Sequence, residues 1–237
     1  PRVFLDSEFQ IKGDTPQHVT KTNLLNRYDV PAFAEIRGAF NIDENNVITV
    51  TADVASYINL NNLRTFIAVN EKTTTKNNVE YGGTGEKEWH HVMMKMLPDA
   101  EGTELDFKAG ELQHFEFTYN MDTTFVEELN DLEVAVWIQD YYDHTIYNSN
   151  YLYEYTEHPY TVKNIQLADN DTALLVTWEA PEKGSPLGYN IYINDELVAE
   201  NHNELSYSTN EANGFTVAKV VAVYENGKTS VGVIDNI

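Results

Sequence analysis

Residues 178–227 decide the fold of the second half of the chain. They read Trp-Glu-Ala-Pro at 178–181, Gly-Tyr-Asn-Ile-Tyr-Ile at 188–193 and Val-Val-Ala-Val-Tyr-Glu-Asn-Gly at 220–227. Short apolar runs bounded by residues that favour turns are typical of β-strands. This order predicts a small antiparallel sandwich and divides the chain into two modules.

Strand and turn signals continue through residues 161–237. Turns every 8–12 residues or so, with short strands between them, are typical of a sandwich. The expected strands are 162–167, 172–178, 188–193, 197–199, 205–208, 216–224 and 229–234. Alternation places apolar residues on one face of three of these strands, and we expect them to meet around Trp178. These residues are Leu174, Val176 and Trp178; Tyr189 and Ile191; and Ala218, Val220 and Ala222.

Residues 161–237 resemble a fibronectin type III domain. The residues that carry the resemblance are Trp178 with Pro181, Gly188, Tyr189 and Ile191, and Ala222, Val223, Tyr224 and Gly227. Thr216, with Phe215 beside it, stands where that family has a tyrosine before a late strand. The resemblance implies a module that binds or spaces other parts rather than one that catalyses.

Residues 30–160 predict a second antiparallel sandwich with longer connections. Its expected strands are 34–42, 47–54, 63–69, 89–97, 115–119, 132–139 and 146–155. The alternation is clearest at 132–139, where Leu132, Val134, Val136 and Ile138 face one way and Glu133, Ala135, Trp137 and Gln139 the other. We expect residues 72–88, rich in Thr, Asn and Gly, to form an exposed loop.

Residues 1–29 predict a strand at 1–6 followed by one helix. Thr15 and Pro16 suit a helix start, and Leu24, Leu25 and Tyr28 suit an apolar stripe. One strand and one helix make no core, so we expect this piece to dock on the next module or to belong to a missing one. The predicted domains are therefore 1–29, 30–158 and 159–237.

Residues 1–155 are similar to the outer membrane protein 28-related family of Bacteroidetes. The motifs that carry this are Asn26-Arg27 with Pro31-Ala32; Asn62-Leu63-Arg64; residues 91–98 with Glu101-Gly102; and residues 136–140 with Ile146-Tyr147. The resemblance implies an exported, envelope-associated protein with a thioredoxin-like region ahead of the sandwich. It places Pro1 at that fold's cis-proline, residues 2–28 in its closing strand and helix, and any redox motif upstream.

Composition excludes several classes of partner and chemistry. The chain has 38 Asp and Glu against 15 Lys and Arg, for a net charge of -23, spread over both halves. Such a charge repels nucleic acid and anionic lipid, and leaves cations, glycans or basic proteins as conceivable partners. We favour the interpretation that the acidic side chains serve to keep the protein solvated.

The chain has no cysteine, which excludes disulfides and thiolate sites. No apolar run is long enough for a membrane helix. The chain opens on Pro1 rather than Met, which indicates processing or trimming, so we expect any membrane association to use an anchor outside it.

Histidines offer one candidate metal site. His90 and His91 follow Trp89, and His114 on a later strand would be the third ligand. Neighbouring residues of a strand point to opposite faces, so His90 and His91 cannot share a metal without a bulge. We therefore interpret them as structural or surface residues and predict no metal site here.

Seven of the 15 tyrosines lie in residues 141–160. Tyr151, Tyr153 and Tyr155 alternate onto one face, which fits a platform for stacking against sugar rings. The same pattern fits a core or a seam between domains, with the hydroxyls at the rim, and we favour that interpretation.

Acidic and amide side chains form two clusters that could hold a structural calcium ion. They are Asp43-Glu44-Asn45-Asn46 and Asp169-Asn170-Asp171. Neither has the spacing of an EF-hand, and both compositions are common in hairpin turns. We favour turns and predict no cofactor beyond this possibility of calcium.

The sequence thus predicts a mainly β chain of two consecutive antiparallel sandwiches of immunoglobulin or fibronectin type III kind, with a short α/β piece in front. We expect a non-enzymatic protein, exported to the cell envelope or surface, that acts in binding, adhesion or scaffolding through a protein or glycan partner. We find no recognisable catalytic triad. Two alternatives stay open: a carbohydrate-binding module, and the C-terminal part of a thioredoxin-like redox protein.

Overall fold

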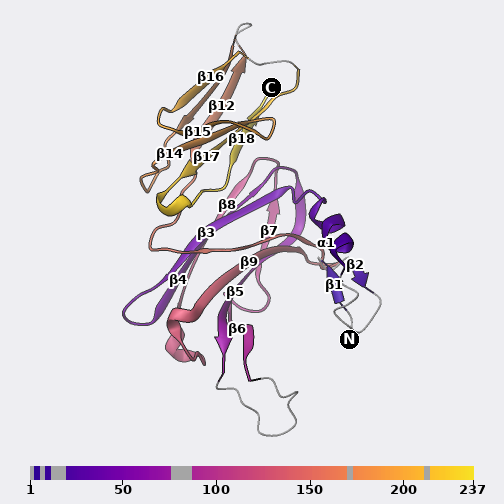
Figure 1. Ribbon diagram of the computed structural model, residues 1–237, viewed down its shortest axis with the longest axis vertical. Coiled ribbons are helices and arrows are strands. Elements are labelled where there is room, and N and C mark those ends of the chain that lie inside the picture. The colour runs from indigo at the N-terminus through magenta and orange to yellow at the C-terminus, as the bar shows by residue number, and fades with distance from the viewer. Residues whose placement is uncertain (1–2, 6–8, 12–19, 76–86, 170–172, 211–213) are drawn as a thin grey trace.

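Strands make up most of the chain and form two sandwiches stacked end to end (Figure 1). The computed structural model describes residues 3–5, 9–11, 20–75, 87–169, 173–210 and 214–237. Each sandwich encloses its own cluster of buried apolar side chains, one drawn from residues 34–152 and the other from residues 162–233. The predicted fold class is therefore confirmed.

The first sandwich packs a five-stranded sheet against a four-stranded sheet. The larger sheet has the order β10–β9–β5–β6, with β7 also paired to β5. Its strands are β5 (Leu60–Thr74), β6 (Trp89–Leu97), β7 (Thr103–Phe107), β9 (Leu132–Asp140) and β10 (Ile146–Tyr151). The smaller sheet has the order β11–β3–β4–β8, with β3 (Ala34–Ile42), β4 (Val47–Ser56), β8 (Leu112–Asn120) and β11 (Tyr153–Glu154). Only β11 and β3 pair in parallel among the described strands.

Alternating side chains build the core between these two sheets. On β9, Leu132, Val134, Val136 and Ile138 are at most 1% exposed, and the residues between them are partly exposed on the other face. On β4, Ile48, Val50, Ala52 and Val54 are fully buried in the same core. The period of two therefore places Thr51 and Asp53 on the outer face of the smaller sheet.

The first sandwich differs from the sequence prediction in three places. Residues 146–155 form two strands in different sheets, because the buried Leu152 lies between β10 and β11 and fills the core. Residues 72–74 continue β5 instead of starting a loop, and residues 76–86 lie outside the described chain. The short strand β7 was not predicted, since it offers only two buried apolar residues, Leu105 and Phe107.

The described residues of the second sandwich form seven strands, the number predicted. One sheet has the order β12–β13–β16, with β12 (Lys163–Asp169), β13 (Leu174–Glu179) and β16 (Ser206–Thr209). The other has the order β15–β14–β17–β18, with β14 (Gly188–Ile193), β15 (Glu196–His202), β17 (Val217–Val223) and β18 (Val233–Asn236). Trp178 lies in the core with Tyr189 edge-on to it at 5.4 Å between ring centroids. Thr216 is buried and Phe215 is exposed.

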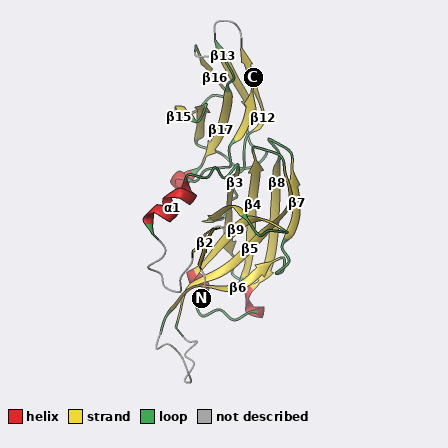
Figure 2. Ribbon diagram, turned by 90° about the vertical axis from the view of Figure 1, so that its right-hand side faces the viewer, coloured by secondary structure: helices red, strands yellow, loops and turns green. Residues whose placement is uncertain are grey.

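The N-terminal piece is a hairpin and one helix at the flank of the first sandwich (Figure 2). Strands β1 (Val3–Leu5) and β2 (Phe9–Ile11) pair antiparallel, and helix α1 spans Lys21–Tyr28. The hydroxyl of Thr20 accepts a hydrogen bond from the backbone N–H of Asn23, which caps this helix. The predicted start at Thr15 and Pro16, like Pro1, lies outside the described residues.

The predicted apolar stripe of α1 is exposed. Leu24 and Leu25 are 49% and 48% exposed and Tyr28 is 86% exposed. These side chains line a groove whose other wall includes Ile146 and Tyr147 of β10. Within the described residues, no helix has the length and apolar character needed to cross a membrane.

A buried carboxylate organises the loop before β9. Glu71 of β5 is fully buried, and its two oxygens accept hydrogen bonds from the backbone N–H groups of Glu127 at 3.1 Å and Glu128 at 2.6 Å. The loop also contains two short 3₁₀ turns, η2 (Met121–Thr123) and η3 (Leu129–Asp131). Glu71 thus supplies the acceptors that a buried loop backbone requires.

Candidate functional site at the joint between the sandwiches

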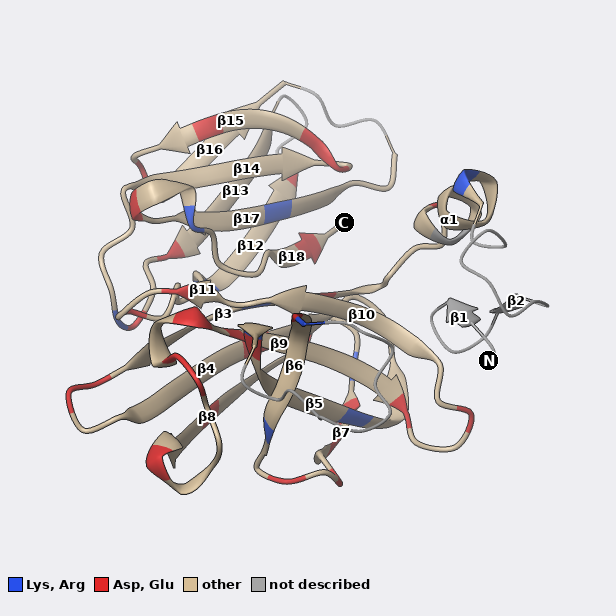
Figure 3. Ribbon diagram, turned by 60° about the horizontal axis from the view of Figure 1, so that its bottom comes forward, with Lys and Arg blue, Asp and Glu red and all other residues tan. Residues whose placement is uncertain are grey.

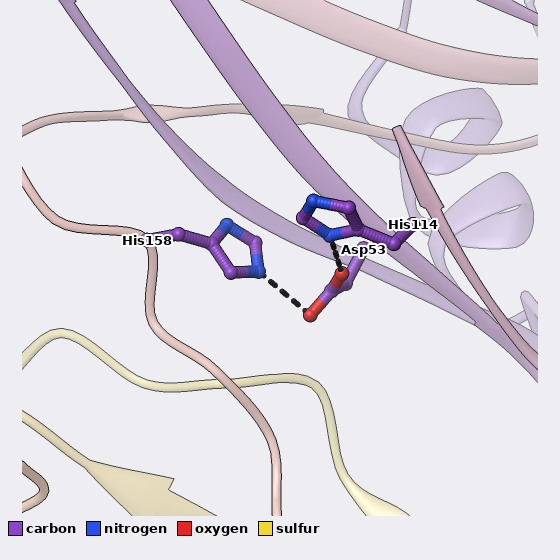
Figure 4. A group of neighbouring side chains, drawn as sticks. All are labelled: Asp53, His114 and His158. Atoms are coloured by element: carbon purple, nitrogen blue, oxygen red, sulfur yellow. Dashed lines mark hydrogen bonds and ion pairs between the residues drawn. The ribbon is translucent and has the colours of Figure 1, made fainter. Parts of the chain in front are cut away.

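A buried polar cluster lies on the outer face of the smaller sheet of the first sandwich (Figure 4). Its centre is Asp53 of β4, which is 2% exposed. Asp53 stands directly opposite His114 of β8, and opposed residues of neighbouring strands bring their side chains together. The third member is His158, 5% exposed, from the segment that follows β11.

The carboxylate of Asp53 bridges the two histidines. Its Oδ1 lies 2.6 Å from Nδ1 of His114 and its Oδ2 lies 2.7 Å from Nε2 of His158. A carboxylate oxygen can only accept at neutral pH, so both of these ring nitrogens carry protons. The rings of His114 and His158 meet edge to face at 4.9 Å between centroids.

The other nitrogen of His158 is held by Thr51, the residue on β4 that shares the outer face with Asp53. Its Nδ1 lies 3.0 Å from the hydroxyl oxygen of Thr51. That hydroxyl is also 3.2 Å from the carbonyl oxygen of Ala39 on β3, to which it donates. Both ring nitrogens of His158 therefore have partners on β4, and its orientation is fixed.

The cluster shifts the pKa of two of its members. Burial by itself raises the pKa of the Asp53 carboxyl, but the hydrogen bonds and positive charge of His114 and His158 together lower it below its usual value. The hydrogen bond to Asp53 raises the pKa of the His114 imidazole, against the smaller opposing effect of partial burial. Both shifts favour a carboxylate paired with a protonated His114.

A hollow lies next to His158. It is lined by residues of both sandwiches, among them Thr51, Glu116, His158 and Tyr160 and, from the second sandwich, Gly184 and Ser185. The ring of Tyr160 meets that of His158 edge-on at 4.7 Å between centroids. The cluster is thus buried at its centre and open to solvent on one side.

Glu35 of β3 joins the two sandwiches beside this cluster. Its Oε2 accepts hydrogen bonds from the hydroxyl of Tyr57 at 2.7 Å and from the backbone N–H of Gly232, in the second sandwich, at 3.0 Å. Its Oε1 pairs with Arg37 at 2.9 Å. Burial and then the charge of Glu35 raise the pKa of Tyr57 far above its usual value, so this hydroxyl stays protonated and donates.

Further hydrogen bonds connect the segment after β11 to the loop between β17 and β18. The hydroxyl of Tyr224 donates to the carbonyl oxygen of Tyr160 at 2.5 Å, and that of Thr161 donates to the carbonyl oxygen of Val231 at 3.0 Å. Burial raises the pKa of Tyr224, which keeps that donor neutral. We call residues 155–161 the connecting segment, and we call these hydrogen bonds, together with the contacts of Glu35, the joint.

The three tyrosines predicted as a sugar platform are divided between different surroundings. Tyr151 ends β10, is 53% exposed and lies beside the ring of His91. Tyr153 and Tyr155 come after the point at which the chain passes from the larger sheet into the smaller one, and both contact the second sandwich. The hydroxyl of Tyr153 lies 3.5 Å from the hydroxyl of Thr229, and Lys228 lies 4.0 Å above the ring of Tyr155.

His90 and His91 lie on β6, in the other sheet from His114. His91 is exposed and its Nδ1 contacts Glu133 of β9 at 2.6 Å, while Nδ1 of His90 is 3.3 Å from the hydroxyl of Thr73. His91 has a positive φ of 55°, and the register shift between β5 and β6 lies further along, between Val69 and Asn70. The structure therefore brings His114 to Asp53 and His158, not to His90 and His91.

The first acidic cluster proposed for calcium forms a hairpin turn between β3 and β4. The Oδ1 of Asp43 accepts the backbone N–H groups of Asn45 at 2.8 Å and Val47 at 2.9 Å. These two bonds lower the pKa of Asp43. In the second cluster, Asn170 and Asp171 lie outside the described residues.

Sequence reasoning missed Asp53 and His158 as members of a site. Asp53 is one acidic residue among 38, and His158 lies outside any periodic pattern, more than 100 residues away along the chain. One signal was available: an acidic residue that faces outward on a central strand, opposite a histidine on its neighbour. To recognise this signal one must know how β4 and β8 are paired residue by residue, and the sequence does not specify that register.

No protein-family model matches the chain, and no curated protein does either. Among solved structures it is similar to HBP35 of Porphyromonas gingivalis, with a TM-score of 0.45 and 17% identity over 91% of this chain and 67% of that one. It is also similar to the chicken CNTN1 FN1–FN3 domains, with a TM-score of 0.30 and 14% identity over 86% of this chain and 62% of that one. A third is the Spr0440 glycoside hydrolase domain, Endo-D, of Streptococcus pneumoniae R6, with a TM-score of 0.29 and 11% identity over 86% of this chain and 36% of that one. Such likeness concerns the fold and transfers no activity.

Proposed function

We propose that the protein is a non-enzymatic binding protein of the cell envelope or outer surface, whose two sandwiches act as one body in adhesion or scaffolding. The observation that carries this is the joint. Glu35, Tyr224 and Thr161 make hydrogen bonds there that link the first sandwich and the connecting segment to the second. A fixed joint lets both sandwiches contribute to one binding surface, because their relative orientation is set before the partner arrives.

Two buried carboxylates and one partly buried carboxylate support a structural role for the polar residues. Both oxygens of Asp53, Glu35 and Glu71 are engaged by donors of the protein itself. A general acid or base needs a proton-transfer atom that a substrate can reach. These three carboxylates are instead used to hold strands, loops and the joint in place.

The charge of the chain indicates the kind of partner. Asp and Glu are spread over both sandwiches, and the net charge is -23 (Figure 3). Such a surface attracts basic proteins and repels polyanions and anionic lipid. The placement at the envelope rests on the resemblance to the outer membrane protein 28-related family. We accordingly propose a basic protein partner at the cell surface.

The test is a pull-down with the full chain immobilised, after crosslinking in envelope extract. We expect one specific partner, and its capture to fall steeply as ionic strength rises, since exposed charges are screened over about 8 Å at physiological salt. A chain of similar net charge and unrelated fold is the control. Recovery of no partner, together with full envelope integrity in a deletion strain, would contradict the proposal.

A second candidate is carbohydrate binding, and exposed aromatic rings favour it. Besides Tyr151, two tyrosines that are adjacent in the sequence are exposed, Tyr141 at 48% and Tyr142 at 73%. The guanidinium of Arg64 lies 4.4 Å from the ring centroid of Tyr141. Glu104 pairs with Arg64 at 2.8 Å, so aromatic faces and planar polar groups lie together. Binding on a glycan array that is lost in Tyr142→Ala would support this candidate, and silence of the array would remove it.

A further inference from the structure

Asp53, His114 and His158 have the composition of a metal centre. Among the described residues, these are the side chains of this kind whose three ligand atoms converge within 4.8 Å of one another. They come from β4, β8 and the connecting segment, so three separate parts of the chain meet at one point. Two imidazoles and one carboxylate are a donor set that suits zinc. We infer that they form a site for a divalent transition metal, with zinc the best match.

The distances are close to what such an ion requires. Zinc binds histidine nitrogen at about 2.0–2.1 Å and carboxylate oxygen at about 2.0–2.2 Å, which separates tetrahedral ligands by about 3.3 Å. The nitrogen–oxygen distances are 2.6 and 2.7 Å, each spanned by a proton. Replacing these two protons by one ion widens each nitrogen–oxygen distance by about 0.6–0.7 Å. The two ring nitrogens lie within 4.8 Å of each other, and rotation of the histidine side chains would bring them to the same separation.

The surroundings of His158 favour the same conclusion. Metal-binding histidines almost always have their second nitrogen held by a hydrogen-bond partner. Thr51 holds Nδ1 of His158 at 3.0 Å and leaves Nε2 for the ion. The hollow beside His158, lined also by the exposed Glu116, leaves room for solvent near the site.

A metal here would fasten the connecting segment to the sheet. His158 is followed by Pro159, Tyr160 and Thr161, which lead into the second sandwich. An ion shared by β4, β8 and this segment would hold the connecting segment against the sheet and so tighten the joint. Metal binding by these three ligands does not depend on the proposed protein partner.

The experiment uses the full chain, freed of metal with a chelator. Zinc is titrated by calorimetry, and cobalt(II) is titrated by visible absorbance as a probe of coordination geometry. We expect one ion per chain, the visible bands of a low-coordinate cobalt site, and a higher Tm with zinc. No saturable binding of either ion would overturn the inference.

Matched variants separate this site from binding elsewhere. His114→Ala removes a ligand that is partly exposed, so the fold is expected to survive, as circular dichroism can verify. His91→Ala removes an exposed histidine that also contacts a carboxylate. We expect the first to abolish the cobalt bands and the second to leave them unchanged.

Thr51→Val tests the partner behind His158. Loss of such a partner weakens metal binding by about 10–100-fold, and we expect that loss here. Equal binding by wild type and by His114→Ala would overturn the inference and leave Asp53, His114 and His158 as a hydrogen-bonded network alone.

Discussion

The backbone N–H of Gly232 in the second sandwich donates a hydrogen bond of 3.0 Å to the carboxylate of Glu35 in the first. The same oxygen accepts from Tyr57, and the other oxygen pairs with Arg37. One side chain thus satisfies a donor from each sandwich. Both donors would lose their acceptor together if that side chain were removed.

Replacing Glu35 by alanine is expected to destabilise the chain by about 1–3 kcal/mol, because the donors of Tyr57 and Gly232 would be left without a partner in a partly buried place. Urea denaturation measures this free energy of unfolding. Glu154→Ala, on the exposed end of β11, is the control and should change it by less than about 0.5 kcal/mol. Equal effects of the two variants would contradict a bonding role for Glu35.

Tyr57 should make the stability of the chain sensitive to alkaline pH. Its pKa is raised in the folded state, so its contribution is complete below the pKa of about 10 of an unfolded tyrosine. That contribution is lost as the pH rises above 10, where the unfolded chain ionises first, with a slope of at most about 1.4 kcal/mol per pH unit. Tyr57→Phe should lose stability less steeply above pH 10 than wild type, while Tyr142→Phe, altered at an exposed ring, should behave as wild type.

Glu71 is expected to be among the most sensitive polar positions of the first sandwich. Glu71→Ala leaves the backbone N–H groups of Glu127 and Glu128 without their acceptor and should cost about 2–4 kcal/mol. Glu71→Gln keeps one acceptor oxygen and should cost less. Guanidinium denaturation compares them with Glu182→Ala, at a side chain 76% exposed. If Glu71→Ala costs no more than this control, its buried bonds do not stabilise the loop.

Much of this fold could be predicted from residues that alternate. Leu132 to Ile138 and Leu174 to Trp178 face inward at every second position, because burial on one face of a strand imposes that period. This alternation is absent where a strand was not predicted and where two strands were predicted as one. β7 has two buried apolar residues, and at Leu152 the chain changes sheets without a turn residue to mark it.

The candidate site could not be predicted from the sequence, for a different reason. Its members are polar, so they leave no periodic trace, and their meeting depends on the pairing of β4 with β8 and on the path of the connecting segment. His114 was singled out, but with His90 and His91, which lie in the other sheet. Long-range register is what chain patterns specify least.

Two variants of the second sandwich test how tightly its core is packed. Ile191 is fully buried in the same core as Trp178, so Ile191→Ala should cost about 2–5 kcal/mol through lost contacts and a cavity. Leu197→Ala, at a side chain 44% exposed, should cost far less. Tryptophan fluorescence during denaturation follows both variants. A small effect of Ile191→Ala would show that this core is loosely packed.

The anchoring of His158 has a mechanical consequence. A force that pulls the two sandwiches apart enters the first one through residues 158–161. His158 passes that load to Thr51 and Asp53 on β4, an interior strand bonded on both edges, before it reaches the two-residue strand β11. The shortest pairing of the sheet, between β11 and β3, is thereby shielded from tension.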